Sequence, residues 1–349
     1  MINKNYKIED DLNNIATKCN NLFSDMKGSE IFLTGGTGFI GKWILETIKF
    51  INENYDYDIK ITILTRKSEN FRNNHNNLFS HSNFSFIDGN ILDFTFPKKN
   101  FEYIIHAATD ASAELNDKNP SLMFDTIVGG TRNMLDMVVK CNPRKFLYLS
   151  SGAVYGNQPA EMKKIKENWN GSLCCNDTRA TYAEGKRAAE MLCSIYHKQY
   201  NINVSIARIF ALLGPYLTLG IHFAAGNFLL DALNNKKVIV SGNGLPVRSY
   251  LYSSDLIIFL FHLLLKEEKG INPYNIGSSE SISIKSLAEK ISNLIGNGEF
   301  EILDHNDKGW NLGRYVPDTD KFSKDFNIKR TVSLDESIIK TAQWNGWKK

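Results

Sequence analysis

The sequence predicts an α/β protein, with a doubly wound parallel sheet and a smaller C-terminal lobe. Short apolar runs alternate with segments of helical periodicity, which is typical of a parallel sheet covered on both faces. One strand-to-helix junction is rich in glycine, as in folds that bind phosphate groups at a helix N-terminus. With 349 residues and 42% hydrophobic content, the chain is long enough to bury a large core.

Six apolar runs are the expected inner strands. In chain order they are "EIFLTGG", "IKITILT", "NFSFIDGN", "FEYIIHAAT", "RKFLYLSS" and "NVSIARIF". The first is followed by "TGFIGKWILETIKFI", whose apolar residues recur at helical spacing. Residues 1–29 precede the first strand and are polar, and we expect a helical extension that covers the sheet edge or a dimer surface.

The glycine-rich junction "TGGTGFIG" predicts dinucleotide binding. One glycine allows a tight turn, one lets the backbone approach a pyrophosphate, and one lets helix and strand pack closely. The N-terminus of the following helix then points its free N–H groups at the phosphates. We therefore expect a Rossmann-type domain. The expected cofactor contacts at this junction are Gly35, Thr37, Gly38, Phe39, Ile40 and Gly41.

The end of the second strand indicates which dinucleotide is bound. NAD-binding domains usually carry an acid there, which holds the ribose 2′-hydroxyl. This chain has Thr65 at that position, followed by Arg66 and Lys67. The two cations favour NADP, with NAD as the alternative, unless both are ordinary surface charges. Further expected cofactor contacts are Asn90, Ile91, Ala107, Ala108 and Thr109.

The stretch "TYAEGKRAAEML" places Tyr182 and Lys186 four residues apart on one face of a predicted helix. A neighbouring ammonium and a positively charged nicotinamide lower the pKa of a phenol. The resulting phenolate takes the proton of a sugar hydroxyl while the carbon gives its hydride to the nicotinamide. Ser151 would hydrogen-bond to the same oxygen, and Tyr182 and Lys186 are also expected cofactor contacts. The alternative is an ordinary solvated helix face. His106, at a strand end, is expected to be packed and not to act as a base.

The motifs "TGGTGFIG", "HAA", "SSGAVYG", "YAEGK", "RSYLYSSD" and "RYVPD" occur in this order. From Glu30 to Trp344 the chain resembles the NAD-dependent epimerase/dehydratase family, the extended short-chain dehydrogenase/reductases acting on nucleotide sugars. The resemblance implies a catalytic triad and commonly a homodimer built through a helix bundle. The triad is Ser151, Tyr182 and Lys186. The resemblance also implies substrate contacts, with Arg248 and Arg314 near the pyrophosphate and Asn227 at the phosphates.

The domains that follow from this resemblance are three. Residues 1–29 form the extension, and residues 30–215 form the Rossmann domain with a return segment near 249–260. Residues 216–248 and 261–349 form the nucleotide-sugar-binding lobe. The family's asparagine before "GT" is absent, since only Thr126 and Ile127 stand there, and Phe210 and Ala211 replace the asparagine usual after the sixth strand.

A third departure from the family concerns acids. Related 4,6-dehydratases carry an Asp–Glu pair directly after the serine, and related decarboxylases keep a glutamate in this loop. This chain has Gly152 and Ala153 there, and neither side chain can exchange a proton. Glu184 is expected to point round the far side of its helix from Tyr182. Asp110 and Glu114 are the acids that could reach the pocket instead.

Three functions are therefore compared. The preferred one is an enzyme performing redox chemistry at C4 of a nucleotide-linked hexose, either a 4-epimerase or a 4-keto-reductase. The second is a 4,6-dehydratase that uses Asp110 or Glu114. The third is a catalytically silent NADP-binding or scaffold protein.

Bulk properties favour a cytoplasmic protein. The net charge is +3 and no long Lys/Arg run occurs, so we expect no nucleic-acid or membrane partner. The five cysteines are odd in number and lack zinc-binding spacing, so we expect reduced thiols and no metal site. No apolar run approaches the length of a spanning helix, and the N-terminus is acidic and polar, unlike a signal peptide.

Overall fold

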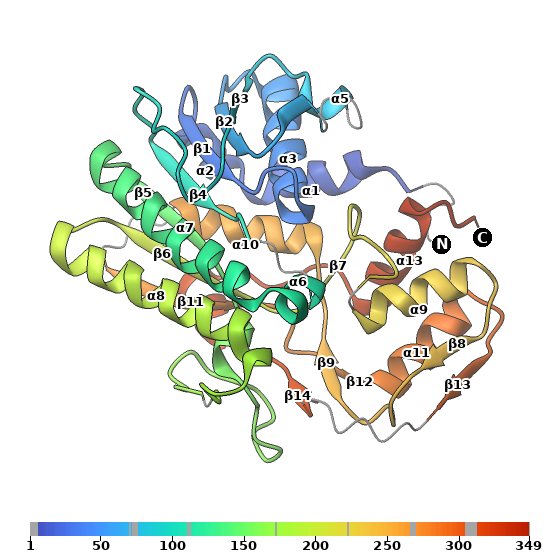
Figure 1. Ribbon diagram of the computed structural model, residues 1–349. Coiled ribbons are helices and arrows are strands. Elements are labelled where there is room, and N and C mark those ends of the chain that lie inside the picture. Colours follow the sequence, from blue (N-terminus) through green and yellow to red (C-terminus); the bar gives the residue numbers. More distant parts are fainter. Residues whose placement is uncertain are drawn as a thin grey trace.

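The structure, a computed structural model, describes residues 6–69, 71, 76–109, 113–171, 173–221, 223–265, 270–303 and 313–348. Its centre is a seven-stranded parallel sheet in the order β11-β6-β5-β4-β1-β2-β3, which confirms the predicted fold class (Figure 1). The strands are β1 (Glu30–Thr34), β2 (Lys60–Thr65), β3 (Phe84–Asp88), β4 (Tyr103–His106), β5 (Lys145–Ser151), β6 (Val204–Ile209) and β11 (Ile271–Ile276). The strand order reverses between β1 and β4, and open α/β sheets bind ligands outside the carboxyl ends of the strands at such a point.

Helices cover both faces of the sheet because its strands are apolar on both sides. One face packs against α3 (Phe39–Tyr55) and α10 (Ser253–Leu265), and the other against α7 (Pro120–Cys141) and α8 (Thr181–Tyr200). Strand β1 shows the alternation: Ile31 and Leu33 join the core under α3 and α10, whereas Phe32 joins the core under α7 and α8. Shorter helical segments are α5 (Asn76–Phe79), α6 (Ala113–Lys118), η1 (Gly152–Tyr155), η2 (Thr178–Ala180) and α12 (Asp320–Phe326).

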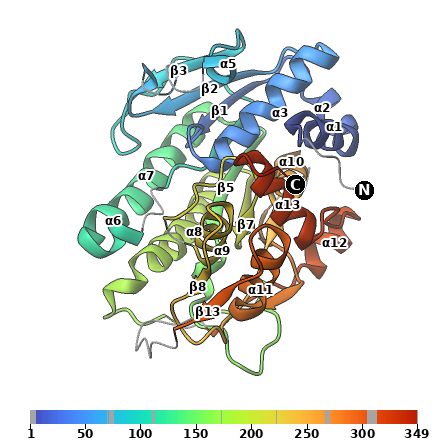
Figure 2. The same ribbon diagram turned by 90° about the vertical axis from the view of Figure 1, so that its right-hand side faces the viewer.

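The N-terminal extension is helical, as predicted, and it thickens one face of the sheet. Helices α1 (Ile8–Lys18) and α2 (Asn20–Asp25) pack against α3 and α10, and their apolar side chains join that core (Figure 2). The buried carboxylate of Asp11 accepts hydrogen bonds from Tyr6 (2.8 Å), Tyr252 (2.6 Å) and Lys340 (2.6 Å). The extension therefore links the first helix to the C-terminal part of the chain. We had expected it to cover the sheet edge or a dimer surface.

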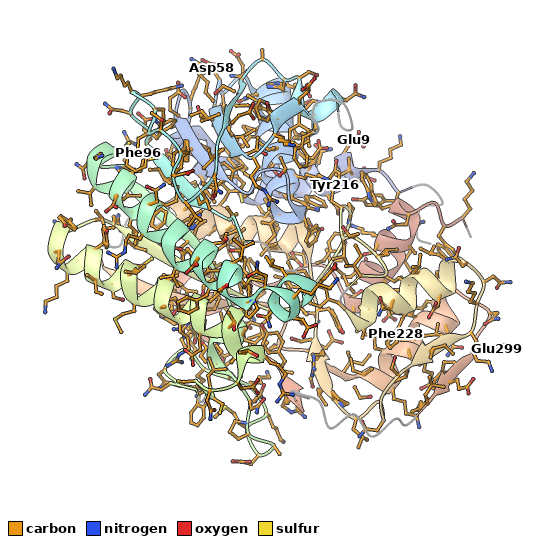
Figure 3. The ribbon with its side chains drawn as sticks, viewed as in Figure 1. Glu9, Asp58, Phe96, Tyr216, Phe228 and Glu299 are labelled. Carbon is orange, nitrogen blue, oxygen red and sulfur yellow. The ribbon has the colours of Figure 1, made fainter. Side chains whose placement is uncertain are left out.

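The C-terminal lobe packs three helices around short strands. The helices are α9 (Ala224–Leu233), α11 (Ile284–Leu294) and α13 (Leu334–Trp344). The strand groups are β7 (Leu212–Leu213) with β10 (Leu251–Tyr252), β8 (Val238–Val240) with β13 (Phe300–Ile302), and β12 (Ser281–Ser283) with β9 (Val247–Ser249) and β14 (Arg314–Tyr315). Phe228 of α9 lies in the lobe's own apolar core (Figure 3).

The chain returns to the Rossmann domain over a longer segment than residues 249–260. Helix α10 is apolar on nearly all sides and is buried against the sheet, and β11 then pairs with β6 along its whole length. Burial against the large sheet satisfies the apolar sequence of α10. Strand β11 is an edge strand of the same sheet. Residues 261–265 of α10 and residues 271–276 of β11 therefore pack with the Rossmann sheet, where we had expected them in the lobe.

Side chains from both parts fix the lobe against the sheet. The indole Nε1 of Trp43 on α3 donates to the carbonyl of Pro215 (2.9 Å). Tyr216, which Figure 3 labels between the two parts, hydrogen-bonds to Glu46 of α3 and contacts the ring of Trp344. Among the described residues, no helix is long and apolar enough to cross a membrane.

Candidate active site

The turn between β1 and α3 requires glycine. Gly35 has φ +73°, and a Cβ there would lie 2.6 Å from the carbonyl carbon of Ala107. A Cβ on Gly41 would overlap the carbonyl oxygen of Gly35. Gly38 is the N-cap of α3, whose first-turn N–H groups have no partner within the helix. Thr37, Phe39 and Ile40 belong to the same turn, where we predict that phosphate binds.

The ends of β2 and β3 bring an acid beside the two predicted cations. Arg66 and Lys67 are exposed after Thr65, as a phosphate-binding pair requires. Thr65 pairs with Asp88 at the end of β3, and the carboxylate of Asp88 accepts from the backbone N–H of Ser68 (2.7 Å). The sequence analysis found no acid at this position. Asp88 is distant from Thr65 in sequence and comes next to it only through the pairing of β2 with β3.

The loops after β3 and β4 line the same edge of the sheet. The side chain of Asn90 accepts from the backbone of Leu92 (3.1 Å) and shapes a turn, and Ile91 is buried against α7. After β4, Ala107 touches the glycine turn. The backbone N–H of Ala108 donates to the hydroxyl of Thr34 (3.1 Å).

His106 is a packed strand-end residue. Its ring nitrogens contact the hydroxyls of Thr34 (2.7 Å) and Thr131 (3.2 Å). Burial, helped by the nearby charge of Lys186, lowers the pKa of His106 to about 3. The imidazole is neutral at physiological pH and serves to join β1, β4 and α7.

Ser151, Tyr182 and Lys186 converge at the carboxyl end of β5. Ser151 is the last residue of that strand and lies beside Tyr182 of α8. Lys186, one turn further along α8, is buried and donates to Thr109 Oγ1 and to the carbonyl of Leu149, both at 2.8 Å. Its ammonium lies 5.9 Å from the centre of the Tyr182 ring.

Burial governs the electrostatics of this cluster in the protein without cofactor. Burial raises the pKa of Tyr182, and the neighbouring Ser151 lowers it. Burial also lowers the pKa of Lys186 to about 7, against the opposing effect of Glu190. The predicted Tyr182 phenolate requires a positively charged nicotinamide as well as Lys186, so it stays a prediction for the cofactor-bound protein.

The space beside Gly152 is filled by aromatic groups. A Cβ on Gly152 would lie 2.6 Å from the ring of Phe210 and 2.7 Å from the hydroxyl of Tyr315. Phe210, which we noted only as a departure from the family, thus occupies the space that a side chain at residue 152 would need. Its ring packs on Tyr315 with centroids 4.5 Å apart. No side chain larger than hydrogen fits at residue 152 without displacing one of them.

The other candidate acids that the structure describes are engaged away from the cluster. Glu114 is exposed and forms an ion pair with Lys118 (2.7 Å). Glu184 pairs with Arg187 at 3.7 Å. Asp110 lies outside the described residues. In the described part of the chain, no group of three or more His, Cys, Asp or Glu side chains is arranged to hold a metal ion.

The predicted substrate residues are only partly brought together. Arg248 on β9 pairs in register with Tyr315 on β14, so both leave the small sheet on one face. Burial lowers the pKa of the Arg248 guanidinium. Arg314 leaves on the opposite face, where its guanidinium lies 3.4 Å from the carbonyl of Lys163. Asn227 is exposed on α9.

Sequence reasoning missed two residues of this site. Asp88 becomes visible only through the pairing of β2 with β3. Tyr315 stands within "RYVPD", a motif we noted for Arg314 alone, and a hydroxyl at that position was a signal that we did not use. Thr109, predicted as a cofactor contact, is also the hydrogen-bond partner of Lys186.

Comparisons with known proteins agree with this fold. The model of the NAD dependent epimerase/dehydratase family matches residues 31–277. UDP-glucuronic acid decarboxylase 1 of Xenopus tropicalis is 30% identical over 92% of this chain and 73% of its own length. UDP-glucuronic acid decarboxylase 3 of Arabidopsis thaliana is 31% identical over 88% of this chain and 86% of its own length.

A solved structure gives the same architecture. The UDP-N-acetylglucosamine 4-epimerase of Methanobrevibacter ruminantium superposes with a TM-score of 0.77 at 23% identity, over 92% of this chain and 99% of that one. This likeness shows the fold, and the family match and the relatives show the lineage. The chain belongs to the NAD-dependent epimerase/dehydratase family.

Proposed function

We propose that this protein oxidises or reduces C4 of a nucleotide-linked hexose, as a 4-epimerase or a 4-keto-reductase. The observation that carries the proposal is the contrast around Ser151. The hydroxyl groups and the lysine for C4 redox chemistry converge there, while Phe210 and Tyr315 fill the place of an acid. Elimination of water needs a base at C5 and an acid at the leaving hydroxyl, and the loop after β5 offers neither.

Each residue of the cluster has a separate task. Tyr182 Oη takes the proton of the 4-hydroxyl during oxidation and returns it during reduction. Ser151 donates a hydrogen bond to the same sugar oxygen and so stabilises the charge that develops on it. Lys186 supplies a cation whose pKa of about 7 lets it gain or lose a proton near neutrality. The bound nicotinamide would supply the hydride chemistry at C4.

The cofactor is held at the carboxyl edge of the sheet. The glycine turn and the N-terminus of α3 would hold the pyrophosphate, and Arg66 and Lys67 would hold a ribose 2′-phosphate. We propose NADP as the preferred dinucleotide on this basis. The negative charge of Asp88 would repel a 2′-phosphate and so opposes this preference. Measuring the affinities for NAD and NADP side by side shows which effect is larger.

The substrate is a nucleotide sugar held by the C-terminal lobe. The forked donors of a guanidinium suit a pyrophosphate, and the half-buried Arg248 is paired in register with Tyr315. Asn227 and Arg314 would complete the phosphate contacts, and for Arg314 this requires its side chain to leave the carbonyl of Lys163.

The relatives suggest a different reaction, and the loop argues against it. The curated relatives are named UDP-glucuronic acid decarboxylases, and enzymes of that kind keep a glutamate after the serine. Gly152 and Ala153 replace it here. The dehydratase alternative is weakened in the same way, because Glu114 is exposed and bonded to Lys118.

We also propose a homodimer formed through the outer faces of α7 and α8. These two long helices run side by side on one surface of the protein (Figure 1). Exposed apolar residues on them are Leu122, Phe124, Met191 and Ile195. Helices of this length with outward apolar residues are suited to a helix bundle between two copies.

The test is a cofactor-coupled assay on purified protein. A 4-keto-6-deoxy sugar nucleotide is added with NADPH: steady loss of NADPH absorbance identifies a reductase. Conversion between C4 epimers without net loss identifies an epimerase. Tyr182→Phe is the control and should lower either rate by about 10²–10⁴-fold.

Other products would contradict the proposal. Formation of a 4-keto-6-deoxy sugar from the parent nucleotide, abolished by Asp110→Asn or Glu114→Gln, would establish a dehydratase. Release of carbon dioxide from UDP-glucuronate would establish a decarboxylase. Wild-type rates equal to those of Tyr182→Phe on every substrate would leave only a silent binding protein.

A further inference from the structure

Lys186 donates its hydrogen bonds, within the described part of the chain, to uncharged oxygens. Two of the three N–H groups of its ammonium donate to Thr109 Oγ1 and to the carbonyl of Leu149, both at 2.8 Å. Neither acceptor carries a charge, although Lys186 is only 3% exposed. Burial removes water from an ammonium and disfavours its charged form. Groups that attract the cation by other means therefore matter at this position.

The ring of Tyr148 lies beside this ammonium. Tyr148 belongs to β5, directly before Leu149, and Lys186 Nζ lies over its ring at 5.0 Å from the centroid. A cation within about 6 Å of an aromatic face is attracted by the negative charge density of that face, and more strongly where water is excluded. Tyr148 is 1% exposed, so both partners are shielded from water. Strand β5 thus presents a carbonyl and a ring face to the same ammonium.

The ring of Tyr148 is held in place and is neutral. It packs in the core under α7 and α8, and its centroid lies 5.6 Å from that of the His106 ring on β4. Burial raises the pKa of Tyr148 well above its ordinary value, so the phenol keeps its proton. His106 is neutral at physiological pH because burial lowers its pKa, so it adds no second positive charge beside this ring. The attraction is therefore between the ammonium and the face of a neutral ring.

The other titratable groups beside Lys186 act differently. Those that the structure describes are Tyr182, Glu190 and Cys193 on α8 and His106 on β4. Glu190 favours the ammonium, but its carboxylate also forms an ion pair with the guanidinium of Arg208 on β6 (2.6 Å). Burial raises the pKa of the Cys193 thiol, so the thiol stays protonated. The ring of Tyr182 has its centroid 5.9 Å from Lys186 Nζ, farther than the ring of Tyr148.

We propose that Tyr148 is a positioning residue, whose ring face stabilises the charged form of Lys186 beside Tyr182. The ring offsets part of the desolvation that burial imposes on the ammonium. Without the ring, the pKa of Lys186 should fall below its value of about 7, and the lysine would be mostly neutral at physiological pH. The proposal rests on the proposed function, in which the cation supports proton exchange at Tyr182.

A double-mutant cycle of stability tests this without substrate or cofactor. Wild type, Tyr148→Leu, Lys186→Met and the double variant are unfolded with urea at about pH 5.5 and about pH 9, on either side of the folded-state pKa of Lys186. At the lower pH the ammonium is charged. We then expect Tyr148→Leu to reduce the folding equilibrium constant by about tenfold more when Lys186 is present than when Met replaces it. At the higher pH the folded-state lysine is neutral, so the two reductions should be equal.

Variants that keep the ring separate its charge distribution from its packing. Tyr148→Phe retains an aromatic face and should couple to Lys186 as strongly as wild type does. A phenylalanine fluorinated around its ring, incorporated at residue 148, has nearly the same shape but a weaker negative face. Relative to Tyr148→Phe, the fluorinated protein should have a several-fold lower folding constant at the lower pH and an equal one at the higher pH. If Tyr148→Leu does not fold, this comparison alone decides.

Phe146→Leu is the matched control for the cavity that Tyr148→Leu leaves. Phe146 lies two residues earlier on the same face of β5 and is buried in the same core. Its loss should show no pH-dependent coupling to Lys186. Coupling between residue 148 and Lys186 that is equal at both pH values overturns the proposal, because it reports packing alone. An effect of fluorination that is absent, or that does not change with pH, also overturns it.

The result is distinguishable from failure of the proposed function. A protein that converts no sugar nucleotide but shows the pH-dependent coupling retains the link between Tyr148 and Lys186 and loses only the proposed reaction. A protein that epimerises or reduces a sugar nucleotide without this coupling keeps the reaction and loses the proposed role of Tyr148.

Discussion

Lys186 is a buried lysine. Burial lowers its pKa to about 7, whereas an unfolded chain would give a value near 10.4. Between these two pH values the unfolded state binds more protons than the folded state, so the free energy of unfolding rises with pH in that window. Below pH 7 the ammonium is charged, and its burial lowers the free energy of unfolding by the full desolvation cost. The proposed role of Lys186 beside Tyr182 requires this burial.

Lys186→Met should therefore stabilise the protein while abolishing its reaction. We expect the midpoint of thermal unfolding to rise by about 2 °C or more at pH 6.5, because a variant without the buried charge avoids its desolvation. The gain should disappear as the pH approaches about 10.4. Lys198→Met, an exposed lysine on the same helix, is the control and should show no such pH dependence. A lower midpoint at pH 6.5 would mean that the bonds to Thr109 and Leu149 outweigh desolvation.

Gly152 should not tolerate even one added methyl group. Gly152→Ala forces its Cβ against Phe210 and the hydroxyl of Tyr315, and we expect a loss of about 1–3 kcal/mol in the free energy of unfolding. Urea unfolding measures this change. Ala153→Ser, at the neighbouring half-buried position, is the matched control and should stay within about 0.5 kcal/mol of wild type. Equal urea midpoints for both variants would show that the Phe210 side chain moves aside at little cost in free energy.

At the residue scale, the sequence predicted groups that share one element or one motif. Tyr182 and Lys186 lie on one helix, and the glycines lie in one turn, so their spacing already fixed their relation. Tyr315 lies against Gly152 from a distant strand, and only the packing of the lobe against the sheet brings the two residues together. Sequence spacing also does not show burial, which raises the pKa of Tyr182 in the protein without cofactor.

At the scale of elements, the ends of β2 and β3 are where we propose that the choice of dinucleotide is made. We expect the pair Arg66→Ala and Lys67→Ala to weaken NADP⁺ binding by about tenfold or more and to leave NAD⁺ binding nearly unchanged. Asp88→Asn should do the reverse and strengthen NADP⁺ binding, because it removes a negative charge next to Ser68. Calorimetric titration with each dinucleotide measures both. If the double variant lost affinity for NAD⁺ and NADP⁺ equally, the two cations would contribute to dinucleotide binding without selecting the 2′-phosphate.

Helix α1 should matter to the stability of the whole chain. Asp11→Ala removes the common acceptor of Tyr6, Tyr252 and Lys340, and we expect a cost of about 3 kcal/mol. Asp10→Ala, its exposed neighbour, should be nearly neutral in the same unfolding experiment. A small effect of Asp11→Ala would show that the two phenols and the ammonium find other partners when the carboxylate is lost.

The elements themselves were predicted unevenly, for physical reasons. Inner strands are continuous apolar runs, and all six expected runs became strands of the sheet. Strand β11 was missed because "INPYNI" contains a proline and polar residues, which an edge position tolerates. The lobe's strands are two or three residues long, too short for any periodicity to appear.

For the whole molecule, the outer faces of α7 and α8 make dimerisation testable. We expect Met191→Asp with Ile195→Asp to halve the mass measured by light scattering, since charges would be buried between two copies. Leu245→Asp, at an exposed leucine of the lobe, is the control and should leave the mass unchanged. A wild-type protein with the mass of one chain would rule out the proposed dimer under those conditions.

The late return of the chain to the sheet has a consequence for synthesis. During translation the first six strands emerge before α10 and β11, so β6 has an open edge, and the face under α10 stays bare until the lobe segment that precedes α10 has been made. Nascent chains that stop near Pro215 should therefore bind chaperones or aggregate. Chains released beyond Ile276 contain both α10 and β11, which cover the open face and pair with the free edge of β6.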